Sequence, residues 1–77
     1  MAIGFVLVTL APGQEVAACD AIVRVSGIVE AMPLFGEYDL LVKVEADDWE
    51  ALGRIIIDGI RQVPGVVATK TLTATSL

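Results

Sequence analysis

Residues 25–31 read VSGIVEA and residues 63–69 read VPGVVAT, so one short pattern occurs twice, 38 positions apart. In each copy a helix-like stretch stops at a glycine, the residue that most often ends a helix, and a β-branched run follows. Because both copies mark the same change from helix to strand, we interpret the chain as two β-α-β halves.

Apolar periodicity on either side of the repeats predicts four strands and two helices. The expected strands are residues 4–10, 28–34, 38–45 and 66–73, and the expected helices are residues 13–25 and 47–62. This order is that of the ferredoxin-like βαββαβ fold, an α+β class in which two helices cover one face of a four-stranded antiparallel sheet. We expect a single domain over residues 1–77, since a chain of this length makes one core.

Apolar spacing predicts which side of the first helix is buried, and capping residues predict where the second helix begins. Val16, Cys19 and Val23 recur at helical spacing and should face the sheet. The second helix should begin at Asp47, whose carboxylate caps free N–H groups, with Glu50 completing a capping box.

The second helix also shows an apolar stripe and a polar one. The residues expected on the apolar stripe are Leu52, Ile56, Gly59 and Val63, flanked by Trp49, Ile55 and Ile60. The residues expected on the opposite side are Arg54, Asp58 and Arg61. Ile57 falls on the polar side, and we interpret this exception as a contact point.

The composition exceeds what one small core needs. The sequence is 56% hydrophobic with a mean hydropathy of +0.78, and the first strand is apolar on both sides, with Phe5 and Leu7 opposite Val6 and Val8. Since the helices cover one face of the sheet only, the other face needs a different cover. We expect a homodimer in which two sheets face each other, an association of the dimeric α+β barrel type.

Charge and hydropathy exclude several classes of function. A net charge of −5, with only five scattered basic residues, argues against direct binding of nucleic acid. No apolar run reaches the roughly 18 residues of a membrane span, and the N-terminus carries no basic leader. We therefore expect a cytoplasmic protein with no membrane partner.

The residues needed for catalysis and metal binding are scarce. The chain has no histidine, one cysteine (Cys19), no phosphate-binding glycine loop and no histidine-paired nucleophile. The acidic run around Asp47 and Asp48 suits a helix start and lacks the glycine of a calcium loop. We predict a protein that is not an enzyme and uses neither metal nor cofactor.

The segment around Gly36 is the most informative candidate site. Gly36, Tyr38 and Asp39 place a flexible backbone, an aromatic hydroxyl and a carboxylate at a hairpin tip. One interpretation is turn chemistry; the other is a zwitterion site, where N–H groups near Gly36 hold a carboxylate and Asp39 holds an ammonium. Alternating hydroxyls of the last strand reflect either β-propensity or a polar rim for a ligand; they belong to Thr69, Thr71, Thr73 and Thr75.

Taken in order, these motifs resemble the effector domain of Lrp/AsnC-type transcription regulators, also called the RAM domain. The matching motifs are the glycine-ended patterns at 25–31 and 63–67, the GEYD tip at 36–39, and the threonines Thr69 and Thr71. The resemblance covers essentially the whole chain. It implies a ferredoxin-like dimer that assembles into octameric, decameric or similar rings and binds an amino-acid effector between dimers.

The same resemblance implies which residues form the ligand site. By matching position, the residues that line the pocket or stand near the ligand are Gly36, Tyr38, Asp39, Thr69 and Thr71. Two positions differ from the usual family pattern: Phe35 stands where a small hydroxyl residue is common, and Leu40 where an aromatic residue is common.

The resemblance finally suggests how the protein acts. Full-length members carry an N-terminal helix-turn-helix domain, whereas this chain begins at its first strand. It is therefore similar to stand-alone RAM proteins, which sense amino acids or modulate full-length Lrp/AsnC regulators. The alternatives are a ligand-free assembly partner of such a regulator and, third, a small dimeric ferredoxin-like enzyme.

Overall fold

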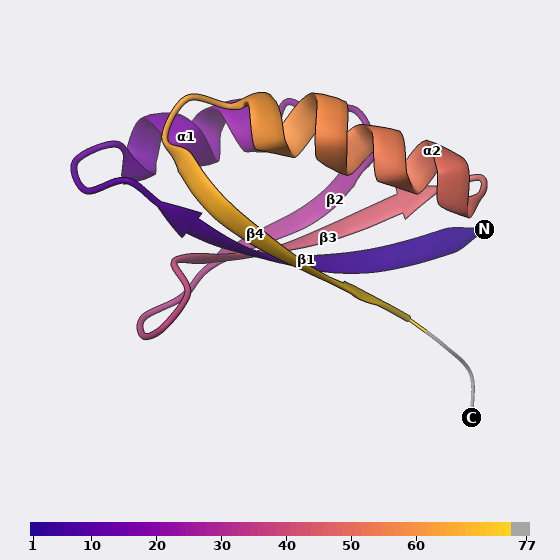
Figure 1. Cartoon of the computed structure of the whole chain (residues 1–77), viewed down its shortest axis with the longest axis horizontal. Helices are drawn as coiled ribbons and strands as arrows, with labels where there is room; N and C mark the ends of the chain where they lie inside the picture. The colour runs from indigo at the N-terminus through magenta and orange to yellow at the C-terminus, as the bar shows by residue number, and fades with distance from the viewer. Residues whose placement is uncertain (75–77) are drawn as a thin grey trace.

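A computed structural model describes residues 1–74. The elements are β1 (Ala2–Leu10), α1 (Glu15–Ile22), β2 (Ile28–Pro33), β3 (Leu40–Ala46), α2 (Trp49–Arg54), the π-turn η1 (Ile55–Gly59), the 3-10 turn η2 (Ile60–Gln62) and β4 (Val66–Thr73). The strands form one antiparallel sheet in the order β2-β3-β1-β4, and both helices lie on one face of it (Figure 1). The predicted ferredoxin-like α+β fold is confirmed. None of the helices in this described part has the length and apolar character to cross a membrane.

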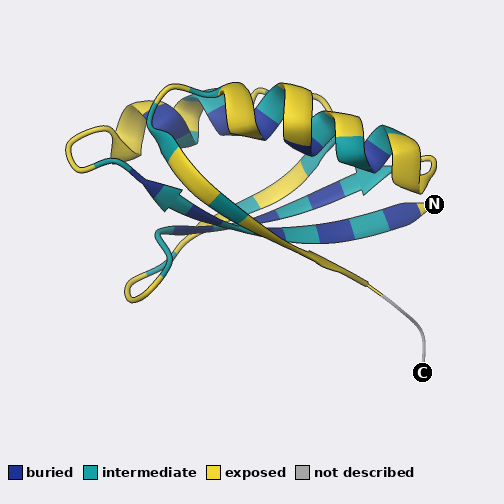
Figure 2. Cartoon of the chain, in the orientation of Figure 1, coloured by how far each residue is buried: buried dark blue, intermediate teal, exposed yellow. Residues whose placement is uncertain are grey.

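The two faces of the sheet differ in burial because side chains alternate along a strand. In β1, Val6 and Val8 are fully buried on the helix side, whereas Phe5 and Leu7 on the other side are half-buried (Figure 2). We call this second side the open sheet face. Its large apolar residues are Ile3, Phe5, Leu7, Met32, Leu41 and Leu72.

The two repeated glycines adopt the same backbone conformation. Gly27 and Gly65 both have a φ of +99°, which residues with a Cβ rarely adopt. Each directly precedes a strand, β2 at Ile28 and β4 at Val66. The repeated sequence pattern therefore marks two equivalent turns from helix to strand, as predicted.

The buried side of α1 differs from the prediction, and α1 is shorter than the expected residues 13–25. Of the three predicted residues, Cys19 packs against the core, whereas Val16 and Val23 are 76% and 53% exposed. The fully buried residues are Ala18 and Ile22. A Cβ added to Gly65 would lie 3.4 Å from the Ala18 methyl carbon, so the turn before β4 packs directly on this small side chain. The buried side of α1 thus contacts a segment far along the chain, which the helical periodicity does not contain.

α2 starts one residue later than predicted. Its N-cap is Asp48, not Asp47, and the Asp48 carboxylate accepts a hydrogen bond from the Ala51 N–H at 2.8 Å. Glu50 forms no capping box with Asp47; it forms an ion pair with Arg54 one turn further along the helix.

The end of α2 passes into the π-turn η1. The fully buried residues are Leu52, Ile56 and Ile60, and Ile60 was expected to flank the predicted stripe. Of the other two stripe residues, Val63 packs against the core, and a Cβ added to Gly59 would meet the Val25 side chain. A π-turn closes i→i+5 hydrogen bonds and so takes more residues per turn than an α-helix. The buried stripe therefore advances by four residues at each step.

Two strands begin at positions other than the predicted ones. β1 starts at Ala2, which pairs with Ala46 at the far end of β3. β3 starts at Leu40 and not at residue 38, because the connection before it closes with a hydrogen bond of 2.9 Å from the Leu34 N–H to the carbonyl of Asp39.

Candidate ligand-binding site

Asp39 ties the hairpin tip to the end of β1. Its N–H donates to the carbonyl of Val8 at 2.9 Å, and its carboxylate Oδ2 accepts the N–H of Leu10 at 2.7 Å. Leu10 lies where the register of β1 against β4 shifts, so the carboxylate supplies an acceptor at an irregular point of the sheet. The second oxygen, Oδ1, accepts no hydrogen bond from residues 1–74.

The rest of the tip faces solvent. Gly36 has a φ of +147°, Gly36 and Glu37 are exposed, and Tyr38 is half-buried. In the described part of the chain, the N–H groups of these three residues donate to no protein acceptor. One Asp39 carboxylate oxygen therefore stabilises the turn, and the other accepts no hydrogen bond from residues 1–74. A free carboxylate oxygen and free N–H groups are the two kinds of partner that a zwitterion needs.

A hollow of about 520 Å³ opens between the tip and α1, and we call it the tip hollow. It contains the carboxylates of Glu15, Asp20 and Asp39 and no basic side chain. Desolvation by burial, followed by the charges of Asp20, Asp39 and Glu15, raises the pKa of the Cys19 thiol, which also lines the hollow. The tip hollow therefore favours cationic over anionic groups. Its other lining residues are Leu10, Val16, Pro33, Leu34 and Phe35.

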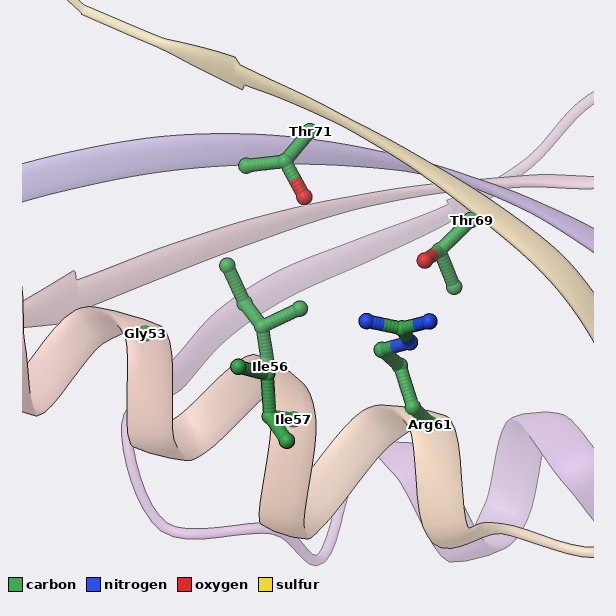
Figure 3. A pocket seen from close by; sticks show the side chains of 6 residues that line it. All are labelled: Gly53, Ile56, Ile57, Arg61, Thr69 and Thr71. Atoms are coloured by element: carbon green, nitrogen blue, oxygen red, sulfur yellow. The ribbon is translucent and has the colours of Figure 1, made fainter.

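A second hollow, of about 330 Å³, lies between α2 and β4, and we call it the α2–β4 groove. Its lining residues are Gly53, Ile56, Ile57, Arg61, Thr69 and Thr71 (Figure 3). Thr69, Thr71 and Thr73 pair with β1 residues that face the helices, so these hydroxyls share one side as predicted; Thr75 lies outside the described residues. The Arg61 guanidinium points toward Thr69, and no acidic side chain lines the groove.

Arg61 is the functional candidate that sequence reasoning missed. The prediction placed it opposite the apolar stripe, and the structure places it in the α2–β4 groove. Gly53, Ile57 and Arg61 follow one another at a spacing of four, and the π-turn η1 between them favours that spacing over 3.6. Ile57, the expected contact point, is 52% exposed and lines the same groove. Ile57, the one apolar residue on the predicted polar side, was thus the feature of the sequence that indicated this groove.

The five predicted site residues fall into separate groups. Asp39 lines the tip hollow, Thr69 and Thr71 line the α2–β4 groove, and Gly36 and Tyr38 line neither. The two hollows have no residue in common. One protomer therefore does not bring the predicted residues together.

The chemistry of both hollows is that of binding. They offer a carboxylate oxygen, an arginine, two hydroxyls and apolar walls. Within residues 1–74, no three side chains of Cys, Asp or Glu gather closely enough to hold a metal ion. A ferredoxin-like domain with such hollows has the features of a small ligand-binding domain.

The particular family follows from sequence comparison. The model of the family described as Lrp/AsnC ligand binding domain matches residues 3–76, so the chain belongs to this family. The crystal structure of FFRP-DM1 is 35% identical to it with a TM-score of 0.91, and the match covers 97% of this chain and 100% of that one.

Two longer curated proteins contain a related segment. The HTH-type transcriptional regulator PH1916 of Pyrococcus horikoshii is 43% identical over 61 residues, which are 79% of this chain and 39% of the regulator. A homocitrate synthase of Sulfolobus acidocaldarius is 50% identical over 50 residues, which are 65% of this chain and 10% of that enzyme. The chain thus spans well under half the length of either relative. The similarity supports a regulatory role and is confined to a small part of the enzyme.

Proposed function

We propose that this chain is an amino-acid-binding regulatory domain that oligomerises and senses amino acids, modulates Lrp/AsnC-type transcription regulators, or does both. In this proposal residues 1–77 act as a single RAM domain, in the cytoplasm, without direct contact to nucleic acid and without catalysis. The observation that carries the proposal is that the hairpin tip holds both an Asp39 carboxylate oxygen and backbone N–H groups that form no hydrogen bond within residues 1–74. Membership in the Lrp/AsnC ligand binding domain family supports it.

The groups at the tip support the proposed recognition of a free amino acid. Backbone N–H groups around Gly36 suit the carboxylate of the ligand, and Asp39 Oδ1 suits its ammonium. The acidic lining of the tip hollow adds to the attraction for an ammonium group. Tyr38 joins the proposed site because it lies between these two residues.

Thr69 and Thr71 can contact the same ligand as Asp39 if a second copy of the chain supplies them. Asp39 and the pair Thr69 and Thr71 line different hollows of one protomer, one acidic and one basic. Surfaces of opposite charge on one chain suit head-to-tail contact between copies, which generates rings when the rotation closes. We therefore propose that the amino acid lies between copies in an octamer, a decamer or a similar ring.

The open sheet face provides the contact for the underlying homodimer. Phe5 and Leu7 are half-buried and Leu72 is 48% exposed, so this face presents contiguous apolar surface in the monomer. Lys43 and Glu45 on the same face form an ion pair at 3.8 Å. Because their charges are already paired with each other, both side chains can be buried in an interface. A sheet-to-sheet dimer would remove this apolar surface from water.

Isothermal titration of the purified chain with the common L-amino acids tests the proposed site. We expect at least one amino acid to bind below millimolar concentration, and Asp39→Asn to weaken that binding at least tenfold because the ammonium loses a charged partner. Thr73→Val is the matched control, since Thr73 lies on β4 outside both hollows. Binding that is absent from the native chain, or unchanged in Asp39→Asn, contradicts the sensor proposal.

A second candidate function is that of a ligand-free assembly partner for a full-length Lrp/AsnC regulator. It is favoured by Phe35, whose side chain projects fully exposed from the tip, as aromatic residues of protein interfaces do. Native mass spectrometry of the chain mixed with a helix-turn-helix regulator of this family, without amino acids, tests it. Mixed oligomers that disappear with Phe35→Ser support this function, and exclusively homomeric species contradict it.

A further inference from the structure

We propose that the α2–β4 groove binds a carboxylate through Arg61, so that the amino acid recognised by this chain is one with an anionic side chain, aspartate or glutamate. This inference rests on the proposed function and adds the chemical class of its ligand. The tip accounts for the charges that every amino acid shares, and the groove supplies one further cation.

The geometry of the groove suits an acidic side chain. Arg61 and Thr69 point toward one another across the opening, and the Thr71 hydroxyl lies further along β4 (Figure 3). A guanidinium and hydroxyls together provide several donors for the two oxygens of a carboxylate. Ile56 and Ile57 form an apolar wall against which the methylene groups of the ligand can pack. A volume of about 330 Å³ lies within the range of small-molecule sites.

The charges around Arg61 leave it available to a ligand. Arg54 pairs with Glu50 and Lys43 with Glu45, whereas Arg61 takes part in no ion pair within residues 1–74. The chain as a whole carries a net charge of −5, so a groove without any carboxylate is an exception on this molecule. An anion is therefore repelled over much of the surface and attracted at Arg61.

The same arginine disfavours neutral ligands. A neutral amide or an apolar side chain placed over Arg61 would take its guanidinium out of water without giving it a partner of opposite charge. Glutamine has nearly the shape of glutamate but lacks the charge, so this pair of ligands isolates the contribution of the arginine.

The test is calorimetric titration of the intact chain and its variants with L-glutamate, L-aspartate, L-glutamine and L-asparagine. We expect the acidic member of each pair to bind at least tenfold more tightly, and Arg61→Gln to remove most of that preference. Arg54→Gln is the matched control, because Arg54 lies on α2 outside the groove and should keep the preference. Both arginines are exposed, so each variant should fold, which circular dichroism checks.

The outcomes separate this inference from the proposed function. Glutamine binding as tightly as glutamate overturns the inference and leaves the amino-acid sensor in place. Glutarate, a dicarboxylate without an ammonium group, is the second probe. If no amino acid binds while glutarate raises the melting temperature of the native chain and not of Arg61→Gln, the anion site stands and the sensor fails. If neither glutarate nor any amino acid binds, both proposals fail.

Discussion

The tip hollow and the α2–β4 groove differ in charge and in how far the fold already uses their polar groups. In the tip hollow, Asp39 accepts the N–H of Leu10 with one oxygen, so a candidate binding residue also holds two segments together. In the groove, Arg61 and the hydroxyls of Thr69 and Thr71 form no side-chain hydrogen bond within residues 1–74. The candidate residue at the tip therefore also supports the fold, whereas the side chains of the candidate residues in the groove form no such bond.

The fold also fixes the two candidate regions in different ways. The acidic end is fixed because a loop residue bonds to the strand ladder, and the basic end is fixed because β4 and the helix place their side chains on facing sides. Substitutions at the tip should change stability and binding together. Substitutions in the groove should change binding with little effect on stability.

The largest effect that tests this comparison is expected for Asp39→Ala. It leaves the N–H of Leu10 without its acceptor in a partly buried position, which should lower the free energy of unfolding by about 1–3 kcal/mol. Asp39→Asn keeps an acceptor oxygen and should lower the free energy of unfolding by less than Asp39→Ala does. Urea denaturation at one fixed protein concentration measures both values, because association would otherwise shift the apparent stability.

The groove supplies the matched control for that measurement. Thr71→Val removes a hydroxyl from an exposed strand position and should change the free energy of unfolding by no more than about 0.5 kcal/mol. Equal losses for Asp39→Ala and Thr71→Val would show that the two regions do not differ in structural role.

A pair of glycine substitutions gives the next largest effect, with opposite signs in the two regions. Gly53 lies inside α2 with no atom within 4 Å of an added Cβ, so Gly53→Ala should stabilise the fold by about 0.5–1 kcal/mol. Gly36 has equally open surroundings but a φ of +147°, so Gly36→Ala should destabilise it by about 1 kcal/mol. Thermal unfolding followed by circular dichroism measures both shifts, and shifts of the same sign would contradict the backbone assignments.

Much of the fold could be predicted because its signals are local. The repeated pattern predicts that each helix is followed by a glycine turn, and Gly27 and Gly65 both have a φ of +99°. Strand alternation likewise predicts that Thr69 and Thr71 share a side. These features depend on residues that are close together in the sequence, so local patterns predict them.

The errors arose where distant segments decide the outcome. Ala18 on α1 packs against the distant turn at Gly65, and Arg61 shares a groove with Thr69 and Thr71 of β4. Asp39 could be located in the candidate site from the sequence, but its bond to Leu10 could not, because the two residues are 29 positions apart. Local periodicity contains none of these long-range contacts.

The smallest effect concerns Cys19, which reports the charge of the tip hollow directly. Burial, and then the carboxylates of Asp20, Asp39 and Glu15, hold the pKa of its thiol above the ordinary value. The thiolate is the reactive form, so alkylation by iodoacetamide should be slower at a given pH in the folded chain than in urea. Asp20→Asn removes one of the negative charges and should shift the folded pH–rate profile to lower pH, whereas Asp58→Asn, on η1 and outside the hollow, should not. Identical profiles for the native chain and Asp20→Asn would mean that burial alone sets the reactivity, and the tip hollow would then lose its proposed attraction for an ammonium group.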